Sequence, residues 1–160
     1  MLFEFLDDSK ERMESGSSSF QTGITTLDFM LNSKKRKMDK LGIQFKLYFQ
    51  ISEIPMEDAD FVVVLGNLLD NAIEAVGKCT PENRKIWMSI QDVNDMFFLC
   101  VKNTYQTAPR RKKNRFITHK SEIQNHGLGI ESVKRIMEKY QGEIYFSYNY
   151  KVFEAKCMIF

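Results

Sequence analysis

The stretch that decides the fold is residues 65–76, LGNLLDNAIEAV, which places three polar side chains on one face of an otherwise apolar helix. At about 100° per residue, Asn67, Asn71 and Glu74 project within a narrow sector, and aliphatic side chains cover much of the remaining surface. Such a helix must be largely buried. A buried amide or carboxylate without a hydrogen-bond partner costs about 1–3 kcal/mol, so these groups need partners. The stretch alone leaves two alternatives open, an internal hydrogen-bond network or a bound ligand.

The length and composition predict one globular domain, since 160 residues with 43% hydrophobic content suit a single core. The 23 Lys and Arg nearly balance the 21 Asp and Glu, so the net charge of +2 gives no general case for nucleic acid binding. No run approaches the about 20 apolar residues of a membrane-spanning helix, and the first residues lack the basic start of a secretion signal. We therefore expect a soluble, cytoplasmic chain. Cys79, Cys100 and Cys157 are widely spaced and predicted to be reduced thiols.

Residues 1–19 are interpreted as a flexible lead-in. An apolar cluster within residues 2–6 precedes a mixed-charge stretch that suits a turn or two of helix, and the run SGSSS at residues 15–19 is typical of a flexible joint. We expect the compact domain to cover residues 20–160, and the lead-in to be the end of some preceding element.

The remaining periodicities predict the order of the elements. They indicate a helix from Thr25, with Thr25 and Asp28 as a capping pair, a strand over 43–51, a helix over 57–76, strands over 86–90 and 97–101, a helix opened by Gly127, and strands over 144–148 and 153–159 joined through Asn149 and Tyr150. This order predicts an α+β fold. The economical packing is a two-layer sandwich, in which about three helices cover one face of a mixed, mostly antiparallel sheet and the other face is more polar.

Residues 105–126 show no convincing period and are predicted to form a mobile lid. A structureless segment of about 20 residues inside a compact domain is uncommon and usually functional or mobile. Five of the six residues from Arg110 to Arg115 are basic. We interpret this run as a solvated lid surface, and a docking face for an acidic partner or nucleic acid is the alternative.

The segment Gly127–Leu128–Gly129 has the composition of an anion site. Two glycines at a helix start let the backbone approach a ligand, and the free N–H groups favour a group such as phosphate. A short Gly-x-Gly pattern alone usually reflects turn geometry. Its conjunction with an Asn-x-x-x-Asn helix, a polar Asn103 after a central strand and a lid is far more specific.

This conjunction resembles a known family. LGNLLDNAIEAV resembles the N box, and NHGLGIESV at residues 125–133 the second glycine box, of the ATP-binding domain of sensor histidine kinases. That domain belongs to the ATPase superfamily shared with gyrase B, the Hsp90 chaperones and MutL. Four short motifs are similar to those of the peptide-pheromone (quorum-sensing) subgroup. They are DNAIEA, a bare Asn-Thr after the central strand, Thr-His-Lys at residues 118–120, and HGLGI. The resemblance covers about residues 22–160.

The resemblance implies roles for particular side chains. Asn71 would ligate Mg²⁺, Asn67 would lie near the phosphates, and Glu74 would act through water. The remaining implied contacts are Lys120 on a phosphate from the lid, and His126, Gly127, Leu128 and Gly129 holding the phosphates at a helix start. Asn103 stands where most of the family has the Asp of a first glycine box, whose glycines are missing here. An Asn still offers an acceptor to the adenine amino group.

The resemblance also implies the reaction. In hydrolysing relatives the position of Asn67 holds a Glu that activates water, and an Asn cannot act as a general base, so ATP would be held for transfer to a protein. His119 and His126 both lie in the lid, and the chain offers no phosphoacceptor histidine on a suitable helix. We therefore expect a domain that binds Mg-ATP and donates the γ-phosphate to a histidine on a separate dimerisation domain of the same kinase.

The same resemblance implies the partners. It implies a membrane-anchored parent protein, an indirect service to a response regulator, dimerisation through a region outside this chain, and no nucleic acid. The alternative is a non-catalytic interaction module, in which the nucleotide merely orders the lid to expose or hide a docking surface.

Overall fold

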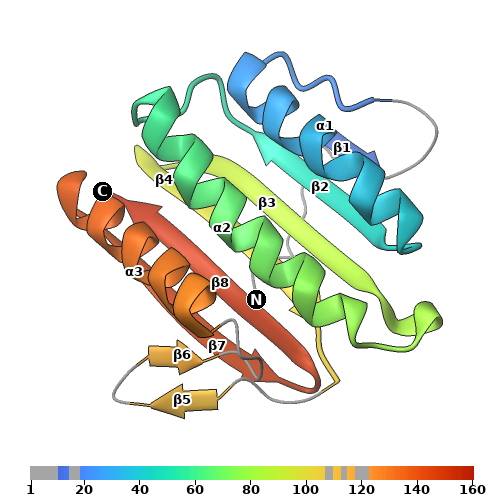
Figure 1. Ribbon diagram of the computed structural model, residues 1–160. Helices are drawn as coiled ribbons and strands as arrows, with labels where there is room; N and C mark the ends of the chain where they lie inside the picture. Colours follow the sequence, from blue (N-terminus) through green and yellow to red (C-terminus); the bar gives the residue numbers. More distant parts are fainter. Residues whose placement is uncertain (1–10, 15–18, 107–109, 113–114, 118–122) are drawn as a thin grey trace.

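The computed structural model describes residues 11–14, 19–106, 110–112, 115–117 and 123–160, with side chains for 19–106 and 129–160. These residues form two layers, three α-helices and a six-stranded sheet (Figure 1). The helices are α1 (Thr25–Lys40), α2 (Asp58–Gly77) and α3 (Ile123–Lys139), and a short 3₁₀ turn covers Pro81–Asn83. The sheet strands are β1 (Glu11–Glu14), β2 (Gln44–Gln50), β3 (Lys85–Val93), β4 (Met96–Thr104), β7 (Gly142–Asn149) and β8 (Val152–Ile159).

The strand order is β1-β2-β3-β4-β8-β7. The neighbours β2 and β3 are parallel, because α2 carries the chain back across the sheet between them. The four remaining neighbour pairs of this sheet are antiparallel. The predicted α+β sandwich with a mixed, mostly antiparallel sheet is therefore confirmed.

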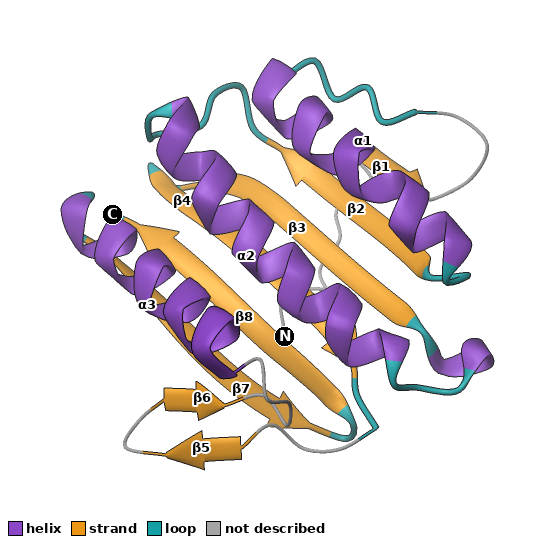
Figure 2. Cartoon of the chain, in the orientation of Figure 1, coloured by secondary structure: helices purple, strands orange, loops and turns teal. Residues whose placement is uncertain are grey.

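All three helices lie on one face of the sheet (Figure 2). In β2, Phe45, Leu47 and Phe49 are buried and belong to the hydrophobic core, whereas Lys46 and Tyr48 alternate with them and are half-buried. The alternation of a strand sends these two sets to opposite faces, so the core lies between the sheet and the helices. Within the described residues, no helix has the length and apolar character needed to cross a membrane.

The start of α1 differs from the prediction. Thr25 does not cap the helix: the N-cap is Ile24, which makes no side-chain cap. Asp28 instead accepts hydrogen bonds from the Thr22 N–H at 2.7 Å, the Thr22 hydroxyl at 2.6 Å and the Gly23 N–H at 3.2 Å. Gly23 has φ +92°, a conformation that glycine adopts readily and that folds the preceding chain over the first turn.

Two further boundaries differ. The mixed-charge stretch for which a helical turn was considered contains β1, which pairs with β2 from Glu11 opposite Phe49 to Glu14 opposite Lys46. Backbone pairing to an open sheet edge does not require an apolar pattern, which explains why residues 11–14 show no strand pattern. The last hairpin turns at Tyr150 and Lys151, one residue later than predicted, and both have the positive φ that a two-residue hairpin turn requires.

The predicted lid is not wholly without regular structure. Residues 110–112 (β5) and 115–117 (β6) pair as an antiparallel ribbon with Lys112 opposite Arg115. A tight hairpin needs only local pairing. Because nearly all residues of this run are basic, it shows no alternation of apolar and polar residues that would predict a strand. Residues 107–109, 113–114 and 118–122 lie outside the described residues. The three cysteines are free thiols and all are buried, as predicted for reduced thiols.

Candidate functional site

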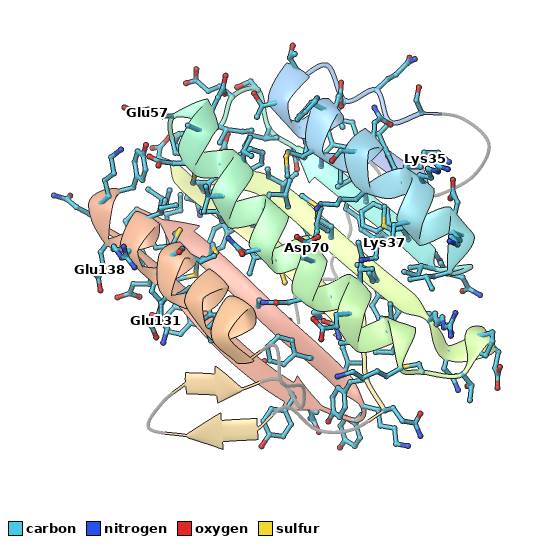
Figure 3. The ribbon with its side chains drawn as sticks, in the orientation of Figure 1. Lys35, Lys37, Glu57, Asp70, Glu131 and Glu138 are labelled. Atoms are coloured by element: carbon cyan, nitrogen blue, oxygen red, sulfur yellow. The ribbon has the colours of Figure 1, made fainter. Side chains whose placement is uncertain are left out.

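The polar face predicted from LGNLLDNAIEAV lies in the C-terminal two thirds of α2. Asn67, Asn71 and Glu74 are each half-buried, whereas the apolar positions around them are buried. Helix α2 lies between α1 and α3 in the helix layer (Figure 1). The neighbouring Asp70, labelled in Figure 3, is not part of this face. Its carboxylate pairs with Lys34 of α1 at 2.7 Å.

Asn67 contacts the backbone of α3 directly. Its Nδ2 donates to the Val63 carbonyl, one turn earlier, at 2.7 Å, and its Oδ1 atom faces Gly129 of α3. A Cβ built on Gly129 would lie 2.5 Å from that Oδ1 and 3.2 Å from the Asn67 Cγ. The glycine therefore allows this close approach of α3 to Asn67, which brings together two motifs that are 62 residues apart in the sequence.

The position of Gly127–Leu128–Gly129 in α3 corrects the prediction. Helix α3 begins at Ile123, four residues before Gly127 (127 minus 123), so the glycines are inside the helix and do not open it. The first four N–H groups of a helix have no partner within it, and here they belong to residues 123–126. Glycine usually marks a helix boundary, but at Gly129 its role is the close contact with Asn67.

Asn103 lies near the end of β4, on the face of the strand that carries the buried Leu99 and Val101. It is 3% exposed, and its Nδ2 donates to the Thr104 carbonyl at 2.9 Å. That bond uses the amide NH₂, so the carbonyl oxygen is the group suited to an amino donor. The adjacent Thr104 hydroxyl accepts from the Lys85 N–H at 3.2 Å and lies 4.0 Å from the Cys79 sulfur. Asn103 therefore lies at the end of the sheet reached by the C-terminal end of α2.

Arg84 fixes this end of α2 and was not singled out from the sequence. Its guanidinium donates to the carbonyls of Leu41 at 2.9 Å, Cys79 at 3.1 Å and Gly77 at 3.3 Å. These acceptors include the last residue of α2, whose terminal carbonyls lack partners within the helix. A basic residue shortly after a helix end is a weak cue for such capping, because it does not identify the carbonyls that it reaches.

A second contact between α2 and α3 lies near the start of α2 and the end of α3. The Tyr140 hydroxyl donates to Asp60 at 2.6 Å and accepts from the Glu57 N–H at 2.9 Å, and the Lys139 ammonium donates to Asp60 at 2.8 Å. The Lys139 ammonium, followed by the Tyr140 hydroxyl, lowers the pKa of the Asp60 carboxyl. The same ion pair raises the pKa of Lys139. No local sequence pattern predicts this contact, because its residues are about 80 positions apart.

The described residues therefore bring together part of the predicted site. Asn67 and Gly129 are in contact, and Asn71 and Glu74 continue the same face of α2 toward the end that Asn103 occupies. Gly127 lies within α3, and the side chains of His126 and Leu128 are not among those described. Lys120 lies outside the described residues.

Comparison with known proteins identifies the family. Residues 56–160 match the model of the GHKL domain, so the chain belongs to the GHKL domain family. A probable C4-dicarboxylate sensor kinase of Halalkalibacterium halodurans is 21% identical over 150 residues, which cover 88% of this chain and 28% of that protein. The chain thus spans about 28% of the length of this curated relative.

Several solved structures that resemble the chain are histidine kinases. The catalytic domain of histidine kinase ThkA superposes with a TM-score of 0.65 at 20% identity, over 93% of this chain and 97% of that one. Full-length ShkA in complex with AMPPNP gives a TM-score of 0.66 at 14% identity, over 90% of this chain and 32% of that one. The Acinetobacter baumannii histidine kinase AdeS gives a TM-score of 0.63 at 17% identity, over 93% of this chain and 66% of that one. At these identities the likeness establishes the fold, which is that of histidine kinase catalytic domains.

Proposed function

We propose that this domain binds Mg-ATP and donates the γ-phosphate to a histidine on a separate dimerisation domain of a two-component sensor kinase. The observation that carries the proposal is the contact between Asn67 and Gly129, which places the polar face of α2 against the Gly-Leu-Gly segment of α3. Family membership supports it, as does a neighbour of the same fold that was solved with AMPPNP. Similarity to the peptide-pheromone subgroup remains a prediction from the wording of the motifs.

The donor chemistry of the face fits a magnesium nucleotide. Mg²⁺ prefers oxygen ligands and is commonly held by one or two side chains together with substrate phosphates and water. The Asn71 amide offers one such oxygen. Asn103, buried at the same end, would accept from the adenine amino group, and the first-turn N–H groups of α3 together with Lys120 would hold phosphates. When bound, the ion would neutralise charge on the transferring phosphate.

Asn67 favours transfer over hydrolysis. Its Nδ2 is engaged with the Val63 carbonyl, and an amide has no basic group with which to activate water. Phosphoryl transfer mainly needs positioned reactants and neutralised charge, so a strong base beside the nucleotide is not required. The acceptor histidine, the response regulator and the membrane anchor of the parent protein belong to this proposal.

The direct test is ATP binding by isothermal titration calorimetry, with Mg²⁺ and with EDTA. Asn71→Ala should weaken Mg-dependent binding at least about tenfold, equivalent to about 1.4 kcal/mol. Asp70→Ala is the matched control, because it changes the next residue of the same helix on the side that faces α1, and its affinity should remain within about twofold of the parent chain. Equal affinities of Asn71→Ala and the parent chain would remove Asn71 from the site.

A second pair of variants tests the adenine contact. Asn103→Asp keeps an acceptor oxygen and should retain binding, whereas Asn103→Ala should lose it at least about tenfold while thermal unfolding confirms that the chain is folded. Transfer itself is tested with γ-labelled ATP and a purified helical hairpin that carries the acceptor histidine. Label on the hairpin supports a kinase, and intact ATP binding without label transfer would instead support the nucleotide-gated interaction module.

A further inference from the structure

The face of the sheet that points away from the helices is built as three rows of side chains. We call it the back face. From β2 to β7 the strand register gives its rows as Lys46–Trp87–Lys102–Glu154–Ser147, Tyr48–Ser89–Cys100–Lys156–Tyr145 and Gln50–Gln91–Phe98–Met158–Glu143. The helix layer lies on the opposite face (Figure 2), so α1, α2 and α3 do not cover these side chains.

The centre of the back face is nevertheless buried. Ser89, Gln91 and Cys100, on the two middle strands β3 and β4, are 4%, 3% and 1% exposed, whereas Tyr145 on the edge strand β7 is 51% exposed. Burial also raises the pKa of the Cys100 thiol to about 12. The Gln91 Oε1 is buried and receives no hydrogen bond from the described residues. A buried acceptor without a hydrogen-bond partner is destabilising, so a covering group with a spare N–H would be stabilised here.

The first residue of β1 lies close to this place. Because β1 is antiparallel to β2 and Glu11 lies opposite Phe49, β1 begins at the end of β2 next to Gln50, and Gln50 shares its row with Gln91 and Phe98. Ten residues precede Glu11. At about 3.3 Å per residue they span up to about 33 Å, and strands about 4.8 Å apart make a six-stranded sheet about 24 Å wide. The segment is long enough to cross the back face.

The composition of residues 1–10, MLFEFLDDSK, complements that face. Its four large apolar side chains, Leu2, Phe3, Phe5 and Leu6, match the aromatic and thioether groups of Trp87, Phe98 and Met158. Its three acidic residues, Glu4, Asp7 and Asp8, outnumber its single Lys10. From β2 to β7 the three rows of the back face carry three lysines, Lys46, Lys102 and Lys156, against the two carboxylates of Glu143 and Glu154. Lys102 at 3.2 Å and Lys156 at 3.6 Å share the Glu154 carboxylate, so the positive charge is in excess.

We propose that the back face is the docking surface of the chain's own N-terminal segment, residues 1–10. The apolar side chains of the segment pack on Trp87 and Phe98, and its carboxylates approach the lysines. One of its N–H groups donates to the side-chain Oε1 of Gln91. The segment thereby covers Ser89 and Cys100. Docking on this side leaves the helix layer free, so it does not obstruct the proposed nucleotide site.

Two intrinsic reporters in the back face allow a direct test with the full chain. Trp87 is the single tryptophan, and Cys100 is a buried thiol whose labelling can be assigned by peptide mass spectrometry. In Phe3→Ser/Phe5→Ser, acrylamide should quench Trp87 more strongly, and an alkylating reagent should modify Cys100 at least about tenfold faster, because a local cover is lost. ATP affinity should stay unchanged. Phe29→Ser, at a phenylalanine that is 65% exposed on α1, is the matched control and should leave both reporters unchanged.

Cys79 and Cys157 separate local opening from global unfolding. Faster modification of Cys100 alone supports the proposal, whereas unchanged quenching and labelling would overturn it. If all three thiols reacted together, the charge-reversed Asp7→Lys/Asp8→Lys chain would decide: faster labelling of Cys100 alone supports docking, and unchanged protection refutes it. Protection of Cys100 that falls on dilution of the protein would assign the cover to a second copy and likewise refute the proposal.

Discussion

Helices α2 and α3 are joined at two contacts in different ways. At one end, Asp60 of α2 meets Lys139 and Tyr140 through side chains that extend from both elements. At the second contact, near the middle of α2, the Asn67 amide meets the backbone of Gly129, with no side chain on the α3 side. Long side chains can follow a small displacement of a helix. At Gly129 the close approach depends on the missing Cβ, and a Cβ there would require either a shift of α3 or a turn of the Asn67 amide.

Breaking the Gly129 contact should have the largest effect. In Gly129→Ala the new Cβ would lie 2.5 Å from the Asn67 Oδ1, so α3 must move or Asn67 must leave the Val63 carbonyl. Alanine normally stabilises a helix interior by about 1 kcal/mol relative to glycine. Here overpacking should reverse the sign and lower the free energy of unfolding by about 1–3 kcal/mol. Urea unfolding measures this loss, and calorimetry should show ATP affinity falling at least about tenfold.

Two further variants make that result specific. Gly77→Ala, at the last residue of α2, meets nothing within 4 Å, so it should be neutral or slightly stabilising. The double variant Asn67→Ala/Gly129→Ala removes the atom that the new Cβ would strike. It should recover most of the lost stability without recovering ATP affinity, since contacting residues are coupled in a double-mutant cycle. Equal stabilities of Gly129→Ala and Gly77→Ala would show that the close approach of α3 to Asn67 does not affect the free energy of unfolding.

Local patterns predicted most of the architecture because each reports a nearby environment. The alternation around Phe45 and Leu47 identified β2, and the apolar residues of LGNLLDNAIEAV identified a buried helix with one polar face. The polar positions of α2 were found for the same reason. Periodicity does not predict a ligand. The proposed ligand and the proposed role of each side chain come from the resemblance of the motifs to a known family.

The missed features depend on partners that are distant in the sequence. Arg84 reaches the Leu41 carbonyl across 43 positions, and Tyr140 reaches Asp60 across 80. No window of sequence contains both members of either pair. The start of α3 differs from the prediction because a glycine usually marks a helix boundary, whereas Gly129 lies inside α3 and approaches Asn67, a contact that only the folded chain defines.

Mutation of the contact between Asp60, Lys139 and Tyr140 should lower the stability less than mutation of Gly129. Tyr140→Phe removes the hydroxyl that donates to Asp60 and accepts from the Glu57 N–H, while the ring remains packed against the core. We expect the free energy of unfolding to fall by about 1 kcal/mol in urea titrations, with ATP affinity unchanged, because Asn67 and Gly129 are untouched. Tyr150→Phe, whose tyrosine is 89% exposed, is the matched control and should leave stability unchanged. A loss of ATP affinity in Tyr140→Phe would show that the two contacts are coupled.

The smallest effect should be a pH dependence confined to Asp60. Its pKa is lowered in the folded chain by Lys139 and Tyr140, so its stabilisation is complete above the unfolded-state pKa of about 3.9 and is lost as pH falls through the lower folded value. The raised pKa of Lys139 keeps that partner charged throughout this range, because its own contribution is lost only at alkaline pH. The difference in urea midpoint between the parent chain and Asp60→Asn should thus be constant from pH 7 to about 5 and narrow below about 4. A difference that stays constant down to the acid transition would mean that packing, and not the Asp60 charge, holds this end of the helices together.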